Sequence, residues 1–415
     1  MEQSQERKAL WILASIQFTN VLDFLIMMPL GPQFMRIFAI SPARFGLLVS
    51  AYAISAGVAG LVAAFGLDQF DRRRSLLVLY AGFVAGTALC GLAPSFAWLL
   101  CARIVTGAFG GVTGAVVLAI VADLVPESRR GAALGLVMSA FSVASIIGVP
   151  LGLFLATHFG WHWTFLGLAA VSVPIWLGAA RSLPQIRSQR PRAAAGERWS
   201  ELSHVITNKN HLWAYALMAM LVFAGFSVIP YLSPFMVKNV GLSEKHLPLI
   251  YLFGGLSTIF TMNWIGRLAD RYGKFRLLAI MASASAAATL LVTSLPPLGP
   301  ALVIAATTSF MVASSGRFVP AMALITAAVD PRYRGSFMSL NASVQHLFSG
   351  AAAFAAGLVI GESAQGRMTR YSLVGLFSSG CALACIVIAH RLSHHSQQTR
   401  LAREALAEIQ ESTGF

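Results

Sequence analysis

Long apolar runs alternate with short polar turns along the whole chain. A helix needs about 20 apolar residues to cross the roughly 30 Å hydrocarbon core of a bilayer. Gly and Pro interrupt the runs, but the alternation of a membrane strand is absent, so the runs are predicted to be α-helices, whose backbone hydrogen bonds close within each segment. Twelve helices are predicted, at about residues 9–31, 45–66, 75–92, 98–122, 131–156, 162–181, 212–236, 248–268, 277–294, 301–327, 336–360 and 371–390.

The two halves of the chain repeat each other at an offset of about 200 residues. Each half holds six runs, and an even number brings both halves into the membrane from the same side, so the repeat is parallel. The equivalent positions are Asp68 and Asp270, Pro29 and Pro230, and Arg130 and Arg334. The predicted organisation is a six-helix bundle at residues 1–180, a basic linker at 181–210, a second six-helix bundle at 211–392 and a tail at 393–415. The tail is predicted to hold a short helix from Leu401.

Composition and charge agree with a membrane protein. With 57% hydrophobic and only 11% charged residues, the chain is not an ordinary soluble domain. Of its 30 Lys and Arg residues, 22 fall in the segments on the side of the termini. This positive-inside pattern places both termini in the cytoplasm and the chain in a bacterial-type inner membrane. A nucleic-acid ligand is not expected, because it would need a single clustered basic patch.

A charged turn at residues 266–274 follows the eighth run and resembles the cytoplasmic loop motif of the major facilitator superfamily, Gly-x-Leu-Ala-Asp-Arg-x-Gly-Arg/Lys. The copy at residues 66–74 departs from it, with Ala64 and Asp71 in place of glycines and Gln69 in place of a basic residue. The resemblance implies an all-α membrane fold, in which twelve helices form two pseudo-symmetric bundles that rock between inward-open and outward-open states.

Gating residues follow from the same resemblance. In this family the loop acid and a loop arginine, here Asp68 and Arg72, join an acid at the inner end of the fourth span, here Asp123, to latch the outward-facing state. Asp270, the equivalent of Asp68, and its neighbour Arg271 are the gating candidates of the second copy. A loop that only sets topology by its charge is the alternative.

Two charges deep in the first half are candidates for proton coupling. Arg103, in Arg103-Ile104-Val105-Thr106-Gly107, resembles the fourth-span arginine motif of proton-linked members. A central arginine costs about 2.5 to 3.5 kcal/mol on insertion scales, so it needs a partner or a water-filled cavity. Asp23 is the one acid deep within a span. Burial favours a neutral acid and a nearby arginine favours a carboxylate, so Asp23 can exchange a proton; a permanent structural ion pair is the alternative.

Polar residues near the middle of the spans are candidates for substrate binding. Arg317 breaks the symmetry of the repeat, because Thr113 stands at the equivalent site, and function is the first hypothesis for such a charge. Pairing of Arg317 with carbonyls freed by Pro320 is the alternative. His346 is as consistent with a structural hydrogen bond as with titration. The full predicted set is Gln17, Asn20, Thr113, Tyr231, Arg317 and His346.

The fifth span carries Gly148-Val149-Pro150-Leu151-Gly152, which resembles the antiporter motif of twelve-span drug:proton antiporters in its sugar-efflux-like form. Pro150 removes a backbone hydrogen bond and predicts a kink. Small residues every four positions predict close approach of a neighbouring helix. These small residues are Gly131, Gly135, Ser139, Gly148, Gly152 and Ala156.

The sequence offers no sign of an enzyme. It contains neither a Walker phosphate loop nor a nucleophile elbow. The four cysteines lie inside apolar runs without His or acid at ligand spacing, so they are predicted to pack and not to bind metal. No cofactor is expected.

The combined prediction is a secondary active transporter that exports small organic molecules, drug-like or sugar-like, in exchange for protons by alternating access. Its partners are a small-molecule substrate, protons and the lipid bilayer, and it works as a monomer. One alternative is a proton-coupled importer of a small anionic metabolite, since two central arginines against one carboxylate leave a positive cavity. The other is a membrane sensor that transports nothing.

Overall fold

The computed structural model describes residues 3–66, 71–184 and 203–413. Within this part of the chain, twelve helices are long and apolar enough to cross a membrane, which confirms the predicted all-α fold. The spans run Ser4–Ile26, Pro42–Ala64, Arg72–Gly91, Phe96–Leu124, Arg129–Phe159, Trp161–Ser182, Lys209–Val240, Glu244–Tyr272, Lys274–Thr293, Pro300–Ala327, Arg334–Val359 and Tyr371–His394.

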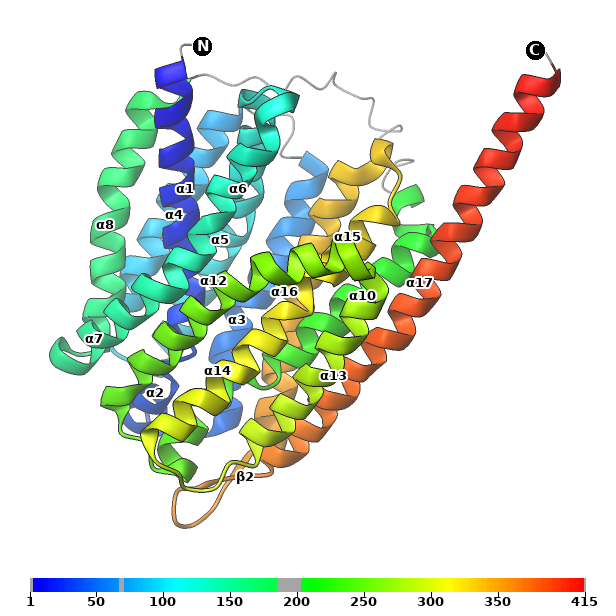
Figure 1. Cartoon of the computed structure of the whole chain (residues 1–415). Coiled ribbons are helices and arrows are strands. Elements are labelled where there is room, and N and C mark those ends of the chain that lie inside the picture. Colours follow the sequence, from blue (N-terminus) through cyan, green and yellow to red (C-terminus); the bar gives the residue numbers. More distant parts are fainter. Residues whose placement is uncertain (1–2, 67–70, 185–202, 414–415) are drawn as a thin grey trace.

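The spans form two bundles of six, coloured blue to green and green to red in Figure 1. The first consists of α1 (Gln3–Ile26), α2 (Gly31–Ile37), α3 (Pro42–Gly66), α4 (Arg72–Gly91), α5 (Phe96–Leu124), α6 (Glu127–Val143), the π-helix η2 (Ala144–Gly148), α7 (Val149–Phe159) and α8 (Trp161–Ser182). The second consists of α10 (Lys209–Phe226), α11 (Ile229–Phe235), the π-helix η3 (Met236–Val240), η4 (Glu244–His246), α12 (Leu247–Tyr272), α13 (Lys274–Thr293), α14 (Pro300–Gly316), α15 (Phe318–Ala327), η5 (Pro331–Tyr333), α16 (Arg334–Val359) and α17 (Tyr371–Thr413).

Equivalent helices break at equivalent places, which bears out the repeat. α1 ends at Ile26, five residues before the predicted end of the first run, and the turn containing Pro29 leads into α2. α10 ends at Phe226, and Pro230 stands in the first turn of α11. Proline has no N–H to donate, so it is favoured in the first turn of a helix, where no partner carbonyl is lost. The first run was therefore predicted too long at this end.

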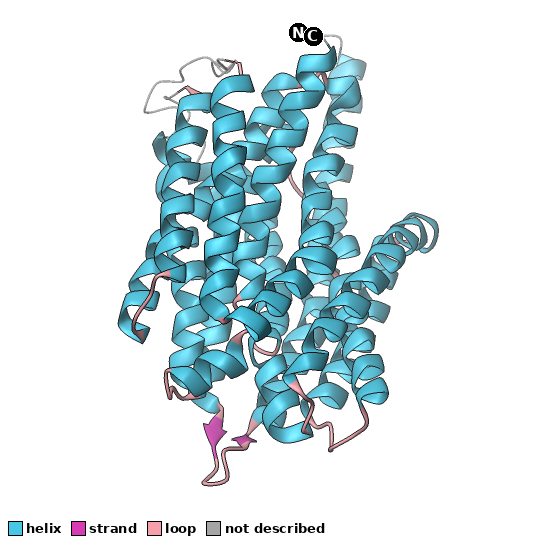
Figure 2. Ribbon diagram, turned by 90° about the vertical axis from the view of Figure 1, so that its left-hand side faces the viewer, coloured by secondary structure: helices cyan, strands magenta, loops and turns pink. Residues whose placement is uncertain are grey.

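Two features lie outside the predicted pattern. The tail is not a separate short helix, because α17 continues unbroken for 43 residues, about 64 Å at 1.5 Å per residue. This is about twice the thickness of the hydrocarbon core. A small antiparallel hairpin, β1 (Gly361–Glu362) and β2 (Met368–Thr369), connects α16 to α17 and is drawn in magenta in Figure 2. Most of the predicted linker, residues 185–202, lies outside the described residues.

The bundles meet along α3 and α16, and along α12 with η2 and α7. Figure 1 shows that the two bundles diverge toward the end that carries both termini. At the opposite end the bundles are in close contact through the Tyr231 seam, which consists of Gly46, Tyr231, Ala353 and Gly357. The Tyr231 hydroxyl donates to the Ala353 carbonyl at 2.6 Å and contacts the Pro42 carbonyl at 3.5 Å. Arg36 of α2 forms an ion pair with Glu244 of η4 beside it.

Candidate functional site

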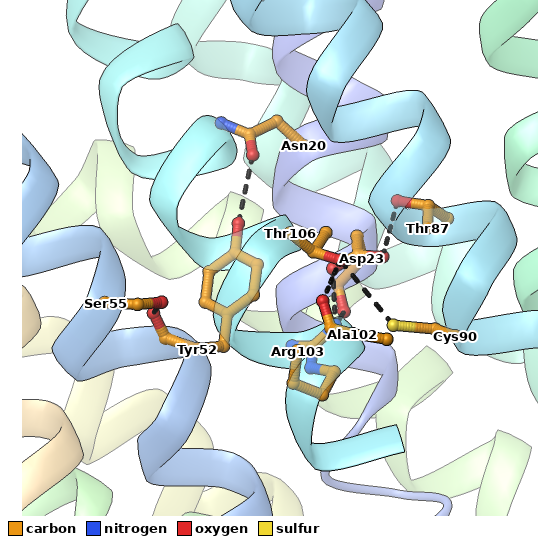
Figure 3. A network of polar contacts seen from close by, with 9 residues as sticks. All are labelled: Asn20, Asp23, Tyr52, Ser55, Thr87, Cys90, Ala102, Arg103 and Thr106. Atoms are coloured by element: carbon orange, nitrogen blue, oxygen red, sulfur yellow. Dashed lines mark hydrogen bonds and ion pairs between the residues drawn. The ribbon is translucent and has the colours of Figure 1, made fainter. Parts of the chain in front are cut away.

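A buried ion pair joins the first and fourth spans. Arg103 Nη1 of α5 donates to Asp23 Oδ2 of α1 at 2.6 Å, and Thr87 Oγ1 of α4 donates to Asp23 Oδ1 at 3.1 Å (Figure 3). Asp23 is 0% and Arg103 1% exposed. The two charges predicted to be candidates for one site therefore lie in contact, inside the first bundle and out of reach of water in this conformation.

Tyr52 of α3 completes this group. Its ring lies under the guanidinium, 4.4 Å from Arg103 Cζ to the ring centroid. Its hydroxyl donates to Asn20 Oδ1 at 3.1 Å, and Asn20 Nδ2 donates to the Gly110 carbonyl at 3.0 Å. We call these residues the Asp23 cluster: Asn20, Asp23, Tyr52, Thr87 and Arg103. Tyr52 and Thr87 were missed by the sequence reasoning, because one polar residue in an apolar run looks like ordinary packing.

Glycines of α5 make room for this arrangement. A Cβ on Gly107 would collide with the Tyr52 carbonyl and the Ser55 hydroxyl, and one on Gly110 would lie 2.5 Å from the Tyr52 hydroxyl oxygen. The spacing from Arg103 to Gly107 therefore brings α3 close enough for the tyrosine ring to reach the arginine.

The surroundings of the ion pair supply contacts beyond the one between the two charges. Removing two charges from water is costly, and their attraction offsets that cost only with good geometry and extra hydrogen bonds. If Asp23 takes up a proton, Arg103 keeps its contact with the Tyr52 ring, and a cation over an aromatic face is worth about 0.5 to 2 kcal/mol. Arg103 Nε has no hydrogen-bond partner among the described residues, so this side of the guanidinium is free to bind a new acceptor.

Aromatic rings connect the cluster to the second bundle. Phe24, the neighbour of Asp23, lies 5.4 Å from Tyr52, 5.7 Å from Phe226 of α10 and 6.5 Å from His346 of α16, measured between ring centroids. His346, predicted to bind substrate, is thus brought to the interface between the bundles and next to the Asp23 cluster.

The other predicted substrate residues are dispersed. Gln17 lies beside Asn20, and its Oε1 has no partner within the described chain. Thr113 donates to the Phe109 carbonyl of its own helix at 2.8 Å. Tyr231 belongs to the Tyr231 seam. The structure therefore places Gln17 beside Asn20 of the Asp23 cluster and His346 beside Phe24, whereas Thr113 bonds within its own helix and Tyr231 lies in the seam.

Arg317 lies at the joint between α14 and α15, inside the second bundle. Its Nη2 donates to the Leu221 carbonyl of α10 at 3.2 Å, and its Nε has no partner in the described part of the chain. At 1% exposure it does not open onto a cavity in this conformation. Its carbonyl contact is to α10 and not to the backbone freed by Pro320, so substrate binding by Arg317 stays a prediction.

Replacing Arg317 by methionine is expected to leave the thermal stability of the purified protein unchanged or raised. Even a whole buried ion pair is often replaced by apolar groups of similar volume at no loss, or with a gain of about 1–4 kcal/mol. Arg317 has no acidic partner among the described residues, so its charge offsets still less of its lost hydration. Thermal unfolding in detergent, with Arg317→Lys as the charge-retaining control, tests this. A clear fall in the Tm of the methionine variant would show that the charge is structurally required.

The first loop copy is only partly described. Arg72 Nε lies 3.4 Å from Asp123 Oδ2, so these two gating candidates are in contact. Asp68 lies outside the described residues. Asp71, which stands where the loop motif has a glycine, caps α4 by accepting from the Arg74 N–H at 2.8 Å. Carboxylates are favoured N-caps, so this residue has a local role.

The second loop copy makes no such latch. Asp270 is exposed and forms no ion pair with a described residue. Arg271 is exposed as well, with its guanidinium 5.4 Å from the Tyr272 ring centroid. The pairing predicted from the resemblance is therefore seen in the first bundle alone, between Arg72 and Asp123.

Close packing in the fifth span is confirmed for one part of the small-residue pattern. A Cβ on Gly148 would lie 2.8 Å from Leu22 Cδ1, and one on Gly152 would lie 2.7 Å from Ile26 Cδ1, so this part packs tightly on α1. The π-helix η2 ends at Gly148, two residues before Pro150 in the first turn of α7. At Gly131 and Gly135 a Cβ would meet nothing within 4 Å, so the predicted close approach is wrong there.

Twelve spans in two pseudo-symmetric bundles, with a buried ion pair inside the first, define a multi-pass membrane transporter and not an enzyme. The sequence profile of the Major Facilitator Superfamily matches residues 13–353, and the chain belongs to this family. Members of the family bind small-molecule substrates.

Relatives and solved structures agree with this assignment. The chain is 27% identical over 359 residues to the uncharacterized MFS-type transporter YceJ of Bacillus subtilis, covering 86% of this chain and 88% of that protein. It is 28% identical over 242 residues to a chloramphenicol resistance protein of Streptomyces lividans, covering 58% and 62%. The crystal structure of a D-xylose-proton symporter shares the fold, with a TM-score of 0.74 at 12% identity over 92% and 96% of the two chains.

Proposed function

We propose that this protein exports small organic molecules in exchange for protons. The observation that carries the proposal is the Asp23–Arg103 pair, a carboxylate at 0% exposure that touches one cation and one hydroxyl. Such a carboxylate can bind a proton when the bundles open it to one side of the membrane and release it on the other. Proton movement down its gradient then drives the substrate the opposite way.

Export, as opposed to import, is supported by the fifth span. Gly148 and Gly152 let α7 and η2 pack directly on Leu22 and Ile26, which flank Asp23 along α1. Dense packing there limits leakage of water and protons past the carboxylate. The name of the chloramphenicol resistance protein also favours export for a related sequence.

The proposed cycle is alternating access. The positive-inside pattern places the termini in the cytoplasm of a cell whose inner membrane holds the protein. The end at which the bundles diverge then faces the cytoplasm, and the Tyr231 seam closes the outer side. A single chain contains both bundles and the whole Asp23 cluster, so the working unit is a monomer.

The substrate is proposed to bind between the bundles, next to the Asp23 cluster. Phe24, Phe226 and His346 supply aromatic surface from both bundles, and Gln17 offers an unpartnered carbonyl oxygen. A site that is mostly apolar with a few polar groups is the common form of a small-molecule pocket.

Transport into inside-out vesicles tests the proposal. Chloramphenicol is the first probe, followed by a panel of toxic compounds and sugars chosen by comparing the growth of expressing and non-expressing cells. We expect accumulation when the vesicle interior is acidified, and its loss on adding a protonophore. Accumulation that survives the protonophore, or uptake driven only by the reverse pH gradient, would contradict proton-coupled export.

A further inference from the structure

A basic hollow lies between α1 and α8 at the end that carries the termini, away from the Asp23 cluster. Its volume is ≈ 680 Å³. We call it the α1/α8 groove, and it is lined by Ser4, Arg7, Lys8, Trp11, Ile12 and Ser182. The two helices pack side by side in Figure 1. The α1 residues follow the i, i+3, i+4, i+7 spacing of one helix face, so they line the groove together.

The cations of the α1/α8 groove have no counter-charge in the part of the chain that the structure describes. Arg7 and Lys8 are exposed, and neither forms an ion pair with any described residue. The nearest acid along the helix, Glu6, is buried and already paired with Arg129 of α6 at 3.0 Å. Among the described residues no acid lines the groove, so this part of the chain presents two uncompensated positive charges at the edge of the membrane.

The groove changes from polar to apolar with depth. Trp11 is 61% exposed and lies one turn, about 6 Å, farther into the membrane than Arg7. Tryptophan is enriched at this level of a bilayer because its amphipathic ring fits the headgroup region. Below it Ser15 donates to the Trp11 carbonyl of its own helix at 2.9 Å, so that its hydroxyl is satisfied.

The α8 side of the groove leaves space for a hydrocarbon chain. Gly178 lies one turn below Ser182 on the same face, and a Cβ there would meet nothing within 4 Å. From the membrane surface inward, the groove therefore presents two cations, then an indole ring, then open apolar surface. A phospholipid has the same order of groups, namely phosphate, glycerol ester and acyl chain.

We propose that the α1/α8 groove is a binding site for an anionic phospholipid. Arg7 and Lys8 bind the phosphate, Trp11 lies against the glycerol ester region, and an acyl chain runs along Ile12 past Gly178. Basic pockets between membrane helices bind anionic headgroups in this way. A zwitterionic headgroup brings its own cation toward Arg7 and Lys8 and binds less well. The site is independent of the transport cycle proposed above.

Native mass spectrometry of the purified full chain tests the site, with dioleoyl phosphatidylglycerol and dioleoyl phosphatidylcholine as probes of identical chains. We expect phosphatidylglycerol to bind more tightly to the wild type. In the Arg7→Gln/Lys8→Gln variant its apparent affinity is expected to fall about 30-fold, about five-fold for each cation. The charge-retaining variant Arg7→Lys/Lys8→Arg is expected to bind as the wild type does.

A matched control removes the same charge elsewhere on the same side of the membrane. Arg332 and Arg334 are exposed, and Arg332→Gln/Arg334→Gln is expected to keep the preference for phosphatidylglycerol. An equal loss in this control would overturn the site, as would equal binding of the two lipids to the wild type. Displacement of phosphatidylglycerol by millimolar glycerol 1-phosphate would show that the groove takes a soluble phosphate and not a lipid.

Fluorescence provides a readout that needs no change to the cations. Phosphatidylglycerol brominated on its acyl chains is expected to quench the tryptophan fluorescence of the wild type more than that of the Trp11→Phe variant. The reason is that Trp11 lies beside the bound lipid. Equal fractional quenching of the two proteins would contradict the proposed position of the lipid.

Discussion

Replacing Asp23 by asparagine is expected to abolish proton-driven transport and to destabilise the protein. Asparagine keeps the size of the side chain but removes the charge opposite Arg103, whose guanidinium is 1% exposed. Breaking a buried ion pair from one side costs about 3–5 kcal/mol, because the remaining charge is left without a counter-ion. The measurements are substrate accumulation in inside-out vesicles and thermal unfolding in detergent.

Two further variants separate the role of Asp23 in proton coupling from its role in stability. Asp23→Asn/Arg103→Gln removes both charges and is expected to recover most of the lost stability without recovering coupled transport. Asp23→Glu keeps a carboxylate and is expected to keep part of the coupling. Unchanged gradient-driven transport by Asp23→Asn would refute the role of this carboxylate in coupling. Recovery of coupled transport in the double variant would show that the ion pair serves stability alone.

Replacing Gly46 by alanine is expected to open the Tyr231 seam. A Cβ at this position would collide with the Tyr231 hydroxyl and lie 2.8 Å from the Ala353 carbonyl oxygen, which belongs to the backbone and cannot swing away. Overpacking of this kind costs about 1–3 kcal/mol. That cost falls on the closed arrangement, so the equilibrium should shift away from it about 5- to 150-fold.

Spin labels on cysteines introduced at Ser41 and Ser243, in a background without the four native cysteines, measure the separation of the bundles at the seam end. We expect a longer distance in Gly46→Ala than in the parent. Adding Tyr231→Phe removes one of the two collisions and should restore part of the closed population. Gly135→Ala is the matched control, since a Cβ there meets nothing within 4 Å. An unchanged distance in Gly46→Ala would contradict the seam as a barrier.

The number and type of the spans could be predicted from the sequence, because hydrocarbon imposes the same length and the same internal hydrogen bonding on every helix. The ends of the helices were less predictable. Hydropathy continues past Ile26, whereas the helix stops there because of the proline turn that follows. The continuation of α17 to Thr413 was missed for the opposite reason, since the tail is polar and its helix needs no membrane.

The candidate site was predictable where a residue is expensive to bury. Asp23 and Arg103 stand out because a charge inside a bilayer needs a reason. Tyr52 and Thr87 carry no such cost and gave no signal, although they complete the surroundings of the pair. Arg317 stood out equally, yet the direction of its side chain, toward α10 and the interior of its bundle, depends on helix rotation and packing.

The sequence by itself determined a duplicated twelve-helix membrane protein, and it predicted a charged partner for a buried charge in one case, Asp23 with Arg103. This follows because apolar length, charge asymmetry and repeated motifs are local properties of the chain. The tertiary structure alone decided which glycines are crowded, since Gly148 packs on α1 and Gly135 faces open space although both share one spacing. It also brought Phe24 to His346 and Tyr231 to Gly46, because contacts between bundles depend on how two rigid bodies meet and not on the pattern within either one.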